Sequence, residues 1–374
     1  MAVVSLGLPT VAPQARPRGG SGGRALPTDR PDAPGLVDRF DRAATDLRVS
    51  LTDRCNLRCT YCMPAEGLPT LPRDAVMTRE EIVRLVGIAT RDLEVRQVRF
   101  TGGEPLLRGD LVEIVRDCAA LPDRPELSLT TNAVGLDHRA RALRDAGLDR
   151  VNVSLDTLDP DTFATMARRP FLERTLAGLA AAAEVFDVVK VNAVLVHGVN
   201  AEHAADLLTW CLERGFELRF IEQMPLDADH SWSRTSMVTA AQVRDLLAER
   251  FTLVPDDAPR DGAPAERFAV LTRGPGGGSG QAATPRLGTV GIIASVTEPF
   301  CADCRRTRLT AEGGVRSCLF AHTETDLLGP LRAGASDSEL ADAWRTAMWG
   351  KGAGHGMSAP GFTQPERTMS AIGG

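Results

Sequence analysis

Short apolar runs alternate with longer stretches of helical periodicity over residues 46–222 of the chain. Short runs rich in β-branched residues predict strands, and apolar residues spaced along one helix face predict helices. The expected strands are residues 47–51, 95–100, 127–130, 151–155, 188–194 and 218–222. The expected helices begin at Thr78, where T-R-E-E indicates a capping box, and continue at about 109–121, 137–146, 171–186 and 202–214.

The strand–helix unit repeats six times, which predicts a parallel α/β sheet with right-handed crossovers. Six units fall short of the eight that close a full barrel, so the sheet is either an open doubly wound sheet or a barrel that stays partial. In both architectures ligands bind at the carboxyl ends of the strands. Segments rich in polar residues and glycine follow the strands there, at 52–62, 101–105, 130–132, 154–156 and 222–224, which predicts one site at this edge.

The alternation stops after about residue 230. A helix is expected near 239–250, followed by a linker over about 256–286 with PGGGSG at its centre, a composition typical of a flexible surface loop. An apolar run (VGIIASV), a second group of cysteines and a helix near 337–349 come next.

Charge and hydropathy exclude several classes of protein. The net charge of −6 gives no general affinity for nucleic acid, so an anionic ligand requires a local cluster of cations. The chain has no run of 18 apolar residues and no basic, apolar export signal, which indicates a cytoplasmic protein without a membrane span. Among the 43 cationic residues only Lys190 and Lys351 are lysine, so each of these two is a candidate for a task that arginine cannot perform.

Six of the eight cysteines form two groups of three: Cys55, Cys59 and Cys62, then Cys301, Cys304 and Cys318. Three thiolates leave a tetrahedral zinc one ligand short, but they hold three irons of a four-iron cluster and leave the fourth iron open to an outside ligand. The spacing therefore favours two such clusters. The alternative is one zinc site that uses four of the six cysteines. Cys118 and Cys211 stand alone within helical patterns and are predicted to be buried.

The spacing C-x3-C-x2-C directly after a strand resembles the signature of the radical S-adenosylmethionine superfamily. Within it, the chain resembles the family of GTP 3',8-cyclases that begin molybdenum cofactor biosynthesis. The segments that carry this resemblance are TGGEP (101–105), LTTN (129–132), NVSLD (152–156), RFIEQM (219–224), CADCRRTRLT (301–310) and the terminal Gly-Gly.

The resemblance covers about residues 41–374 and implies a domain organisation. A partial parallel β/α barrel of six units would occupy 41–230, and a smaller C-terminal domain at 231–350 would carry the second iron–sulfur cluster. The tail, 351–374, ends in Gly-Gly. The leader, 1–40, is predicted to be disordered, and it and the loop at 256–286 are longer than the family pattern needs.

The resemblance also implies the roles of the first cysteine group. Its [4Fe-4S] cluster would bind S-adenosylmethionine at the open iron and deliver the electron that yields a 5'-deoxyadenosyl radical. Contacts with S-adenosylmethionine are implied for Tyr61, Gly102, Gly103, Glu104, Ser154 and Met224. The two glycines would let backbone approach the ligand closely.

The second [4Fe-4S] cluster would, by the same resemblance, bind the purine of GTP. Arg48 and Arg99 alternate within predicted strands, and Arg306 and Arg308 would share one side of an extended segment, as expected of residues that bind a triphosphate. The implied set that binds GTP is Arg48, Arg99, Thr130, Lys190, Arg306, Thr307 and Arg308, and the set that acts in the reaction is Lys190, Arg306, Arg308, Gly373 and Gly374.

In this family the radical takes a hydrogen atom from C3' of GTP, and the ribose carbon then attacks C8 of the guanine. The resemblance further implies a downstream cyclic pyranopterin monophosphate synthase, a reductant protein and a homodimer as partners. Two other functions remain open: a different radical enzyme with an auxiliary cluster, acting on a peptide or another substrate, and a zinc-stabilised nucleic-acid module, which the acidic composition disfavours.

Overall fold

The computed structural model describes residues 29–273, 285–357 and 359–373. The described residues from Asp32 onward form one compact unit. Of the leader that was predicted to be disordered, 1–40, residues 1–28 lie outside the described residues, as do the PGGGSG centre of the predicted linker and Gly374. Residues 29–40 are described, and Leu36 and Asp38 among them are buried, which corrects the prediction for this part.

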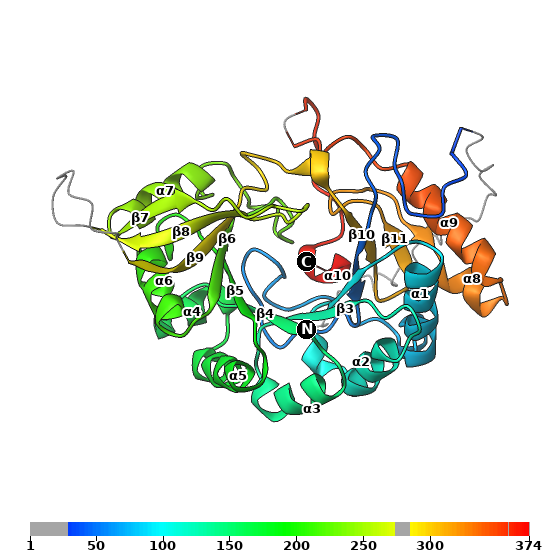
Figure 1. Cartoon of the computed structure of the whole chain (residues 1–374), viewed down its shortest axis with the longest axis horizontal. Coiled ribbons are helices and arrows are strands. Elements are labelled where there is room, and N and C mark those ends of the chain that lie inside the picture. Colours follow the sequence, from blue (N-terminus) through cyan, green and yellow to red (C-terminus); the bar gives the residue numbers. More distant parts are fainter. Residues whose placement is uncertain (1–28, 274–284, 358, 374) are drawn as a thin grey trace, which may run out of the picture. The chain divides into compact units, whose positions relative to one another are not determined.

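A single curved sheet of twelve strands organises the described chain (Figure 1). The strand order is β12-β11-β10-β1-β2-β3-β4-β5-β6-β9-β8-β7, and β1 to β6 are parallel neighbours. The six predicted strands match β1 to β6 to within about two residues at each end. These are β1 (Asp46–Ser50), β2 (Gln97–Thr101), β3 (Glu126–Thr131), β4 (Arg150–Ser154), β5 (Val189–Val194) and β6 (Glu217–Ile221).

Strands from the C-terminal part of the chain extend this parallel sheet at both edges. Strand β10 (Arg306–Leu309) pairs in parallel with β1, and β9 (Arg286–Ile293) pairs in parallel with β6. Antiparallel strands complete the edges: β11 (Gly314–Arg316) and β12 (Thr325–Asp326) beyond β10, and β8 (Glu266–Thr272) and β7 (Phe251–Pro255) beyond β9. The division of the chain into domains at about residue 230 stays a prediction.

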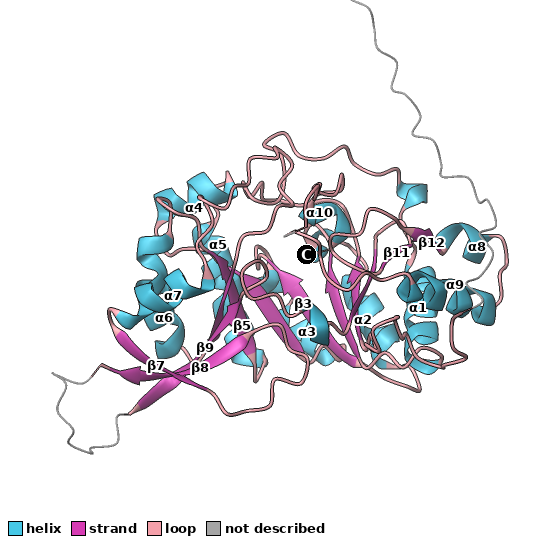
Figure 2. Ribbon diagram, turned by 90° about the horizontal axis from the view of Figure 1, so that it is seen from above, coloured by secondary structure: helices cyan, strands magenta, loops and turns pink. Residues whose placement is uncertain are grey.

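Helices lie on the convex side of the sheet, whereas the short C-terminal helix α10 lies inside its curve (Figures 1 and 2). The predicted helices are found as α1 (Arg79–Arg91), α2 (Leu111–Ala119), α3 (Ala140–Asp145), α5 (Leu172–Val185), α6 (Ala204–Glu213), α7 (Ala240–Ala248) and α9 (Asp337–Trp349). The capping box predicted at Thr78 is present, with reciprocal bonds to Glu81. The local pattern did not predict α4 (Pro160–Ala167), α8 (Leu328–Arg332) or α10 (Met369–Ile372).

Each parallel strand is apolar on one face and polar on the other. Val49, Phe100, Leu129 and Val153 are fully buried and belong to the main hydrophobic core. The alternate positions, which line the concave side, carry arginine, threonine, serine and asparagine. A sheet covered by helices on its convex face can carry so many polar groups on the other face only if that face lines a site or pairs them internally.

The predicted linker at 256–286 is wrong in part. Strand β8 occupies its middle and buries Phe268 and Val270 against β7 and β9. The pattern E-R-F-A-V-L-T alternates as an ordinary strand does, but the Gly- and Pro-rich residues after it dominate the composition of the window. Within the described ranges, no helix is long and apolar enough to cross a membrane.

Candidate functional site

A cavity of about 320 Å³ lies at the carboxyl ends of β1 to β6, at the predicted edge. All six cysteines of the two groups line it, although the groups are more than 230 residues apart in the chain. Cys118 and Cys211 are fully buried in α2 and α6, away from the cavity, as predicted.

The first cysteine group lies in the loop that follows β1. Its thiols are surrounded by apolar groups and by two carboxyl groups, those of Glu104 and Asp156. Burial raises the pKa of Cys55 to about 11 and that of Cys62 to about 12, and it raises the pKa of Cys59 as well. No charged nitrogen lies within hydrogen-bonding distance of these three sulfur atoms in the described structure, and the charge of Arg58 and the hydrogen bonds to Cys55 lower its pKa by less than burial raises it.

Tyr61 points into the cavity between two of these cysteines. Its hydroxyl donates a 2.7 Å hydrogen bond to Oδ2 of Asp156, whose Oδ1 accepts one from the amide of Val194. Burial raises the pKa of Asp156 to about 6. The pair ties the cysteine loop to the ends of β4 and β5, so the ring of Tyr61 is held against the cavity wall. Ser154 and Met224, the other implied contacts of S-adenosylmethionine, line the same cavity.

The glycines of TGGEP serve the packing of two loops. A Cβ at Gly103 would lie 2.3 Å from the carbonyl oxygen of Arg54, and one at Gly102, where φ is +142°, would lie 2.5 Å from that of Thr52. Both glycines also line the cavity, so the predicted approach of backbone to a ligand stays a prediction. The close contact between residues 51–54 and 101–104 already explains why glycine is needed at both positions.

Glu104 is committed to hydrogen bonds within the fold. Its carboxylate accepts from the amides of Leu106 and Asn132 at 2.9 and 2.7 Å and from the hydroxyl of Thr131 at 2.7 Å. Burial raises its pKa to about 7 in spite of these bonds. It still lines the cavity, so a contact with a ligand amino group stays a prediction.

In the second cysteine group, Cys301 and Cys304 lie between β9 and β10 and Cys318 follows β11, and cations surround one of the thiols. Cys304 Sγ lies 3.3 Å from Nη2 of Arg306 and 3.3 Å from Nζ of Lys351. Burial alone would raise the pKa of Cys304, but the two cations outweigh it and the pKa falls to about 6. Cys301 lies beside Cys304 and Cys318 and has a pKa raised by burial. The second group thus presents at least one thiolate at neutral pH without a metal.

Buried arginines line the wall beside the second group. Arg48 is register partner to both Arg99 and Arg308, and Arg219 lies further along the sheet on β6. Burial and, to a smaller extent, neighbouring arginines lower the pKa of Arg99 to about 9 and that of Arg308 to about 10. Burial lowers the pKa of Arg219 to about 10. In the described part of the chain, none of Arg48, Arg99, Arg219, Arg306 and Arg308 forms an ion pair with a carboxylate. Asp46 on β1 interacts electrostatically with Arg48, Arg99 and Arg306 without forming a salt bridge, so the cluster keeps an excess of positive charge that suits an anion.

The two threonines among the predicted GTP contacts, Thr307 and Thr130, differ in whether they line the cavity. Thr307 alternates with Arg306 and Arg308 on β10, so its side chain faces the opposite side, where its hydroxyl accepts a 2.9 Å hydrogen bond from Trp344 of α9. We therefore correct the prediction for Thr307, which is fully buried away from the cavity. Thr130 does line the cavity.

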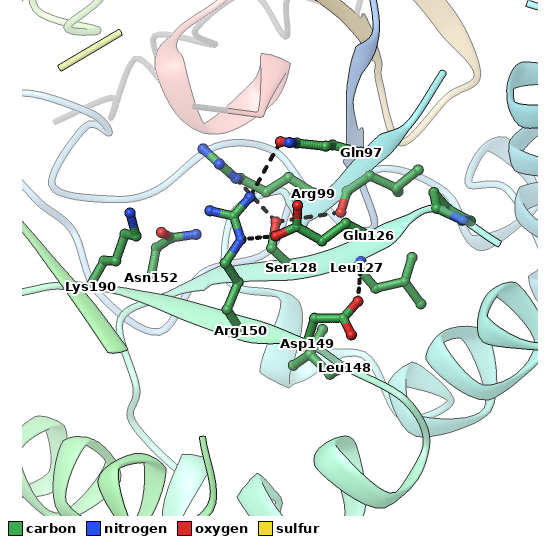
Figure 3. A network of polar contacts seen from close by, with 12 residues as sticks. Gln97, Arg99, Glu126, Leu127, Ser128, Leu148, Asp149, Arg150, Asn152 and Lys190 are labelled. Carbon is green, nitrogen blue, oxygen red and sulfur yellow. Dashed lines mark hydrogen bonds and ion pairs between the residues drawn. The ribbon is translucent and has the colours of Figure 1, made fainter. Parts of the chain in front are cut away.

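Lys190 lies near the amino ends of the strands, beside Asn152 (Figure 3). Its ammonium pairs with Glu217 at 3.0 Å. Next to it, Arg150 bonds to both Glu126 and Gln97. At the amino ends of the strands, the charged side chains on the concave face are therefore paired, whereas the arginines beside the second cysteine group are not. A role of Lys190 toward phosphate stays a prediction.

The C-terminal tail enters the curve of the sheet. The carbonyl of Gly373 accepts a 2.6 Å hydrogen bond from Nη1 of Arg308, and a Cβ at Gly373 would lie 2.4 Å from Oγ of Ser50. With φ at +72°, this position requires glycine on conformational grounds too. Gly374 lies outside the described residues.

The sequence reasoning missed several polar residues that line the cavity, among them Arg219, Asn192 and Gln223. Each has a buried polar atom without a hydrogen-bond partner, namely Nε of Arg219, Oδ1 of Asn192 and Oε1 of Gln223. All three occupy alternate positions that face the concave side: Asn192 on β5, Arg219 on β6 and Gln223 just after β6. The signal that led to Arg48 and Arg99 would have found Arg219 in L-R-F.

Comparisons with known proteins agree with the arrangement. Residues 49–211 match the model of the radical SAM superfamily, and residues 216–357 match the model described as Molybdenum Cofactor Synthesis C. Among solved structures, SuiB of Streptococcus suis bound to S-adenosylmethionine superposes with a TM-score of 0.54 at 16% identity, covering 78% of this chain and 67% of that one. That likeness shows the fold.

Curated relatives are similar over their whole length. A protein of Paenarthrobacter nicotinovorans named GTP 3',8-cyclase is 58% identical over 93% of this chain and all of its own. One of Mycolicibacterium smegmatis with the same name is 54% identical over the whole of both chains, and one of Streptomyces coelicolor is 57% identical over 91% of this chain and 96% of its own. The chain therefore belongs to the GTP 3',8-cyclase family of radical SAM enzymes.

Proposed function

We propose that this chain is a lyase that cyclises GTP to (8S)-3',8-cyclo-7,8-dihydroguanosine 5'-triphosphate, the first step of molybdenum cofactor biosynthesis. One observation carries the proposal: two three-cysteine groups face one cavity, and five arginines that form no salt bridge with a carboxylate among the described residues line its wall. A radical SAM enzyme with an auxiliary cluster would use the first feature, and a triphosphate substrate would use the second.

The donor sets fit iron–sulfur clusters. Each group offers three soft thiols at one wall of the cavity, and their mutual influence on pKa shows that the members of a group lie close together. We assign Cys55, Cys59 and Cys62 to one [4Fe-4S] cluster and Cys301, Cys304 and Cys318 to a second.

With S-adenosylmethionine, the first cluster would supply the 5'-deoxyadenosyl radical that removes hydrogen from C3' of GTP. Tyr61, Gly103, Glu104, Ser154 and Met224 are the proposed contacts of S-adenosylmethionine, and all five line the cavity. Tyr61 is immobilised by Asp156, so its contribution is a fixed surface against which the cofactor is oriented.

The triphosphate is proposed to lie along the arginines. Arg48, Arg99 and Arg308 form one row across three adjacent strands, and Arg306 lies beside the second group. Guanidinium groups recognise phosphate by paired hydrogen bonds, and a buried row of them costs stability unless the anion is bound. Thr130 adds a hydroxyl, and Arg219 joins the set because of its unpartnered Nε.

The tail contributes positioning and exclusion of water. Gly373 is fixed by Arg308, so the same guanidinium that is proposed to bind GTP also holds the tail inside the curve of the sheet. We propose that Gly373 and Gly374 border the substrate and that their lack of side chains leaves room for it. Lys190 would act at the amino edge once Glu217 releases it.

The proposal extends to the surroundings of the enzyme. A cytoplasmic chain of this activity needs a reductant protein to supply electrons and a cyclic pyranopterin monophosphate synthase to take its product, and a homodimer is expected. None of these partners is required for the first test.

The test is an anaerobic assay of the reconstituted protein with iron, sulfide, dithionite and S-adenosylmethionine. Formation of 5'-deoxyadenosine should depend on GTP and be accompanied by loss of GTP and a cyclised product. ATP, CTP and UTP serve as matched controls of equal charge. Cleavage that ignores GTP would discard the substrate and direct the search to peptides or other small molecules.

A further inference from the structure

Lys351 is a buried lysine beside the second cysteine group. It follows α9 and has a relative exposure of 4%. Its ammonium donates to the carbonyl of Arg306 at 3.0 Å, to Sγ of Cys304 at 3.3 Å and to the carbonyl of Cys304 at 3.4 Å. These three acceptors use all three protons of the ammonium, so the geometry is fully determined.

The ammonium has no carboxylate to balance it. Among the residues that the structure describes, Lys351 forms no ion pair with aspartate or glutamate. Burying a lone charge is costly, and a native fold retains one only where an anion compensates it. Among the described residues, the only anion-forming group that it contacts is the thiol of Cys304.

The segment that carries Lys351 is clamped onto the cysteine group. The guanidinium of Arg42 donates to the carbonyls of Cys301, Gly352 and Ala353 at 2.6–2.8 Å. Arg42 is itself held by buried Asp38 at 2.6 Å. The clamp joins residues 38–42, the second group and residues 351–353, so Lys351 keeps its place when the cavity fills.

We propose that Lys351 is a positioning residue that raises the reduction potential of the cluster on Cys301, Cys304 and Cys318. This inference rests on the proposed function, since it requires the second cluster. The ammonium would donate a charge-assisted hydrogen bond to the Cys304 ligand and place one positive charge next to the cluster.

The direction of the effect follows from electrostatics. Reduction adds one negative charge to a cluster, and a nearby cation or hydrogen bond to a ligand sulfur stabilises the reduced form. Arg306 also contacts Cys304 but faces the cavity, where an anionic substrate can neutralise it. Lys351 is absent from the cavity lining, so its charge persists whether or not substrate is bound.

The experiment is a redox titration of the anaerobically reconstituted, full-length protein, followed by electron paramagnetic resonance. A full-length variant with alanine at Cys55, Cys59 and Cys62 identifies the signal of the second cluster. Lys351→Met removes the charge at similar length, Lys351→Arg keeps it, and Lys190→Met is the matched control for loss of a distant lysine.

Lys351→Met should lower the ratio of reduced to oxidised second cluster about tenfold at a fixed potential, which is a downward shift of about 59 mV for one electron. Lys351→Arg should stay within about threefold of the unmodified protein, and Lys190→Met should leave the midpoint unchanged. An unchanged midpoint in Lys351→Met with full iron content would overturn the inference and leave the proposed function standing.

Two further results are informative. If the triple-alanine chain holds no iron and sulfide, the second cluster is absent and the proposed function fails together with the inference. If Lys351→Met does not retain its cluster, Lys351→Gln, which keeps a donor but no charge, replaces it: a lowered midpoint supports the inference, and an unchanged one overturns it.

Discussion

The two cysteine groups share a ligand count and a cavity but differ in electrostatic surroundings. Around the first group, burial and the carboxyl groups of Glu104 and Asp156 raise the pKa of the thiols. Around the second, Arg306 and Lys351 lower the pKa of Cys304 to about 6. The two groups thus have the same number of cysteines, but nearby carboxyl groups act on the first and nearby cations act on the second.

This difference is relevant to two distinct tasks. A cluster near negative charge is harder to reduce and, once reduced, a stronger electron donor, which fits cleavage of S-adenosylmethionine. A cluster among cations is a better place for a polyanionic substrate, because the field that stabilises added electrons also attracts phosphate. If the two groups hold two clusters as proposed, their surroundings, and not their cysteine spacing, would separate the roles of the clusters.

The largest expected effect comes from removing one ligand from either group. Cys55→Ala should abolish formation of 5'-deoxyadenosine, because the first cluster loses a protein ligand. Cys301→Ala should keep the first cluster, bind about half the iron of the unmodified protein and lose the cyclised product. Iron, sulfide and both products are measured in parallel.

The comparison breaks if the two variants behave alike. Full turnover of GTP by Cys301→Ala would show that the second group has no part in the reaction. Cys118→Ala, which changes a buried cysteine outside the cavity, is the control for loss of a thiol as such.

The second prediction concerns thiol reactivity in the metal-free protein. Cys304 has a pKa of about 6 and should react with iodoacetamide at an almost constant rate from pH 7 to 8, then more slowly as the pH falls through 6 and the thiolate is protonated. Cys62, with a pKa of about 12, should gain rate with each pH unit. At pH 7 we expect Cys304 to be labelled at least about a hundredfold faster.

Peptide mass spectrometry after timed anaerobic labelling gives both rates in one sample. Cys304 and Cys62 are both partly exposed, so access does not explain a difference between them. Fully buried Cys211 is the internal reference for an unreactive thiol. Equal rates for Cys304 and Cys62 at pH 7 would remove the electrostatic contrast.

The sequence predicted the six central strands and the inward arginines because both depend on local periodicity. Arg48 and Arg99 alternate with apolar residues, and alternation within a strand determines which face a side chain joins. The pairing of β10 with β1 could not be predicted in this way, since it joins residues about 260 apart and no local pattern encodes such a register.

Short elements account for most of the other differences. Strands β11 and β12 have three and two residues, too few for any periodicity to show. Lys351 was noticed only as a rare lysine, because its contact with Cys304 depends on the tail folding back over the second group. The close packing of Gly102 and Gly103 against 51–54 likewise requires the tertiary structure.

The third prediction locates the substrate on the cationic side of the comparison. Arg219→Gln should weaken GTP binding about tenfold to a hundredfold, since a charge-assisted contact with phosphate is lost from a buried site. Affinity for S-adenosylmethionine should change less than about threefold. Calorimetry under anaerobic conditions measures both affinities, and Arg214→Gln, which alters an exposed arginine at the end of α6, just before the same strand, is the matched control.

The opposite effect on the two affinities would change the assignment of Arg219. If Arg219→Gln weakened S-adenosylmethionine more than GTP, the unpartnered Nε would belong to the side of the first group. Thermal unfolding of the variant separates loss of a contact from loss of the fold, because the guanidinium also donates a 2.7 Å hydrogen bond to Asn152.

The smallest effect on substrate is expected at Thr307, between the two arginines of β10. Its hydroxyl faces α9 and accepts from Trp344, so Thr307→Val should leave GTP affinity within about twofold while lowering the free energy of unfolding by about 1–3 kcal/mol, the cost of an unsatisfied buried donor. Calorimetry and denaturant unfolding measure the two quantities. Thr130→Val is the matched control, since the same change on the cavity wall should weaken binding and leave stability nearly unchanged. A large loss of GTP affinity in Thr307→Val would mean that β10 does not present alternate residues to the two faces. The assignment of the arginine row to the triphosphate would then be wrong.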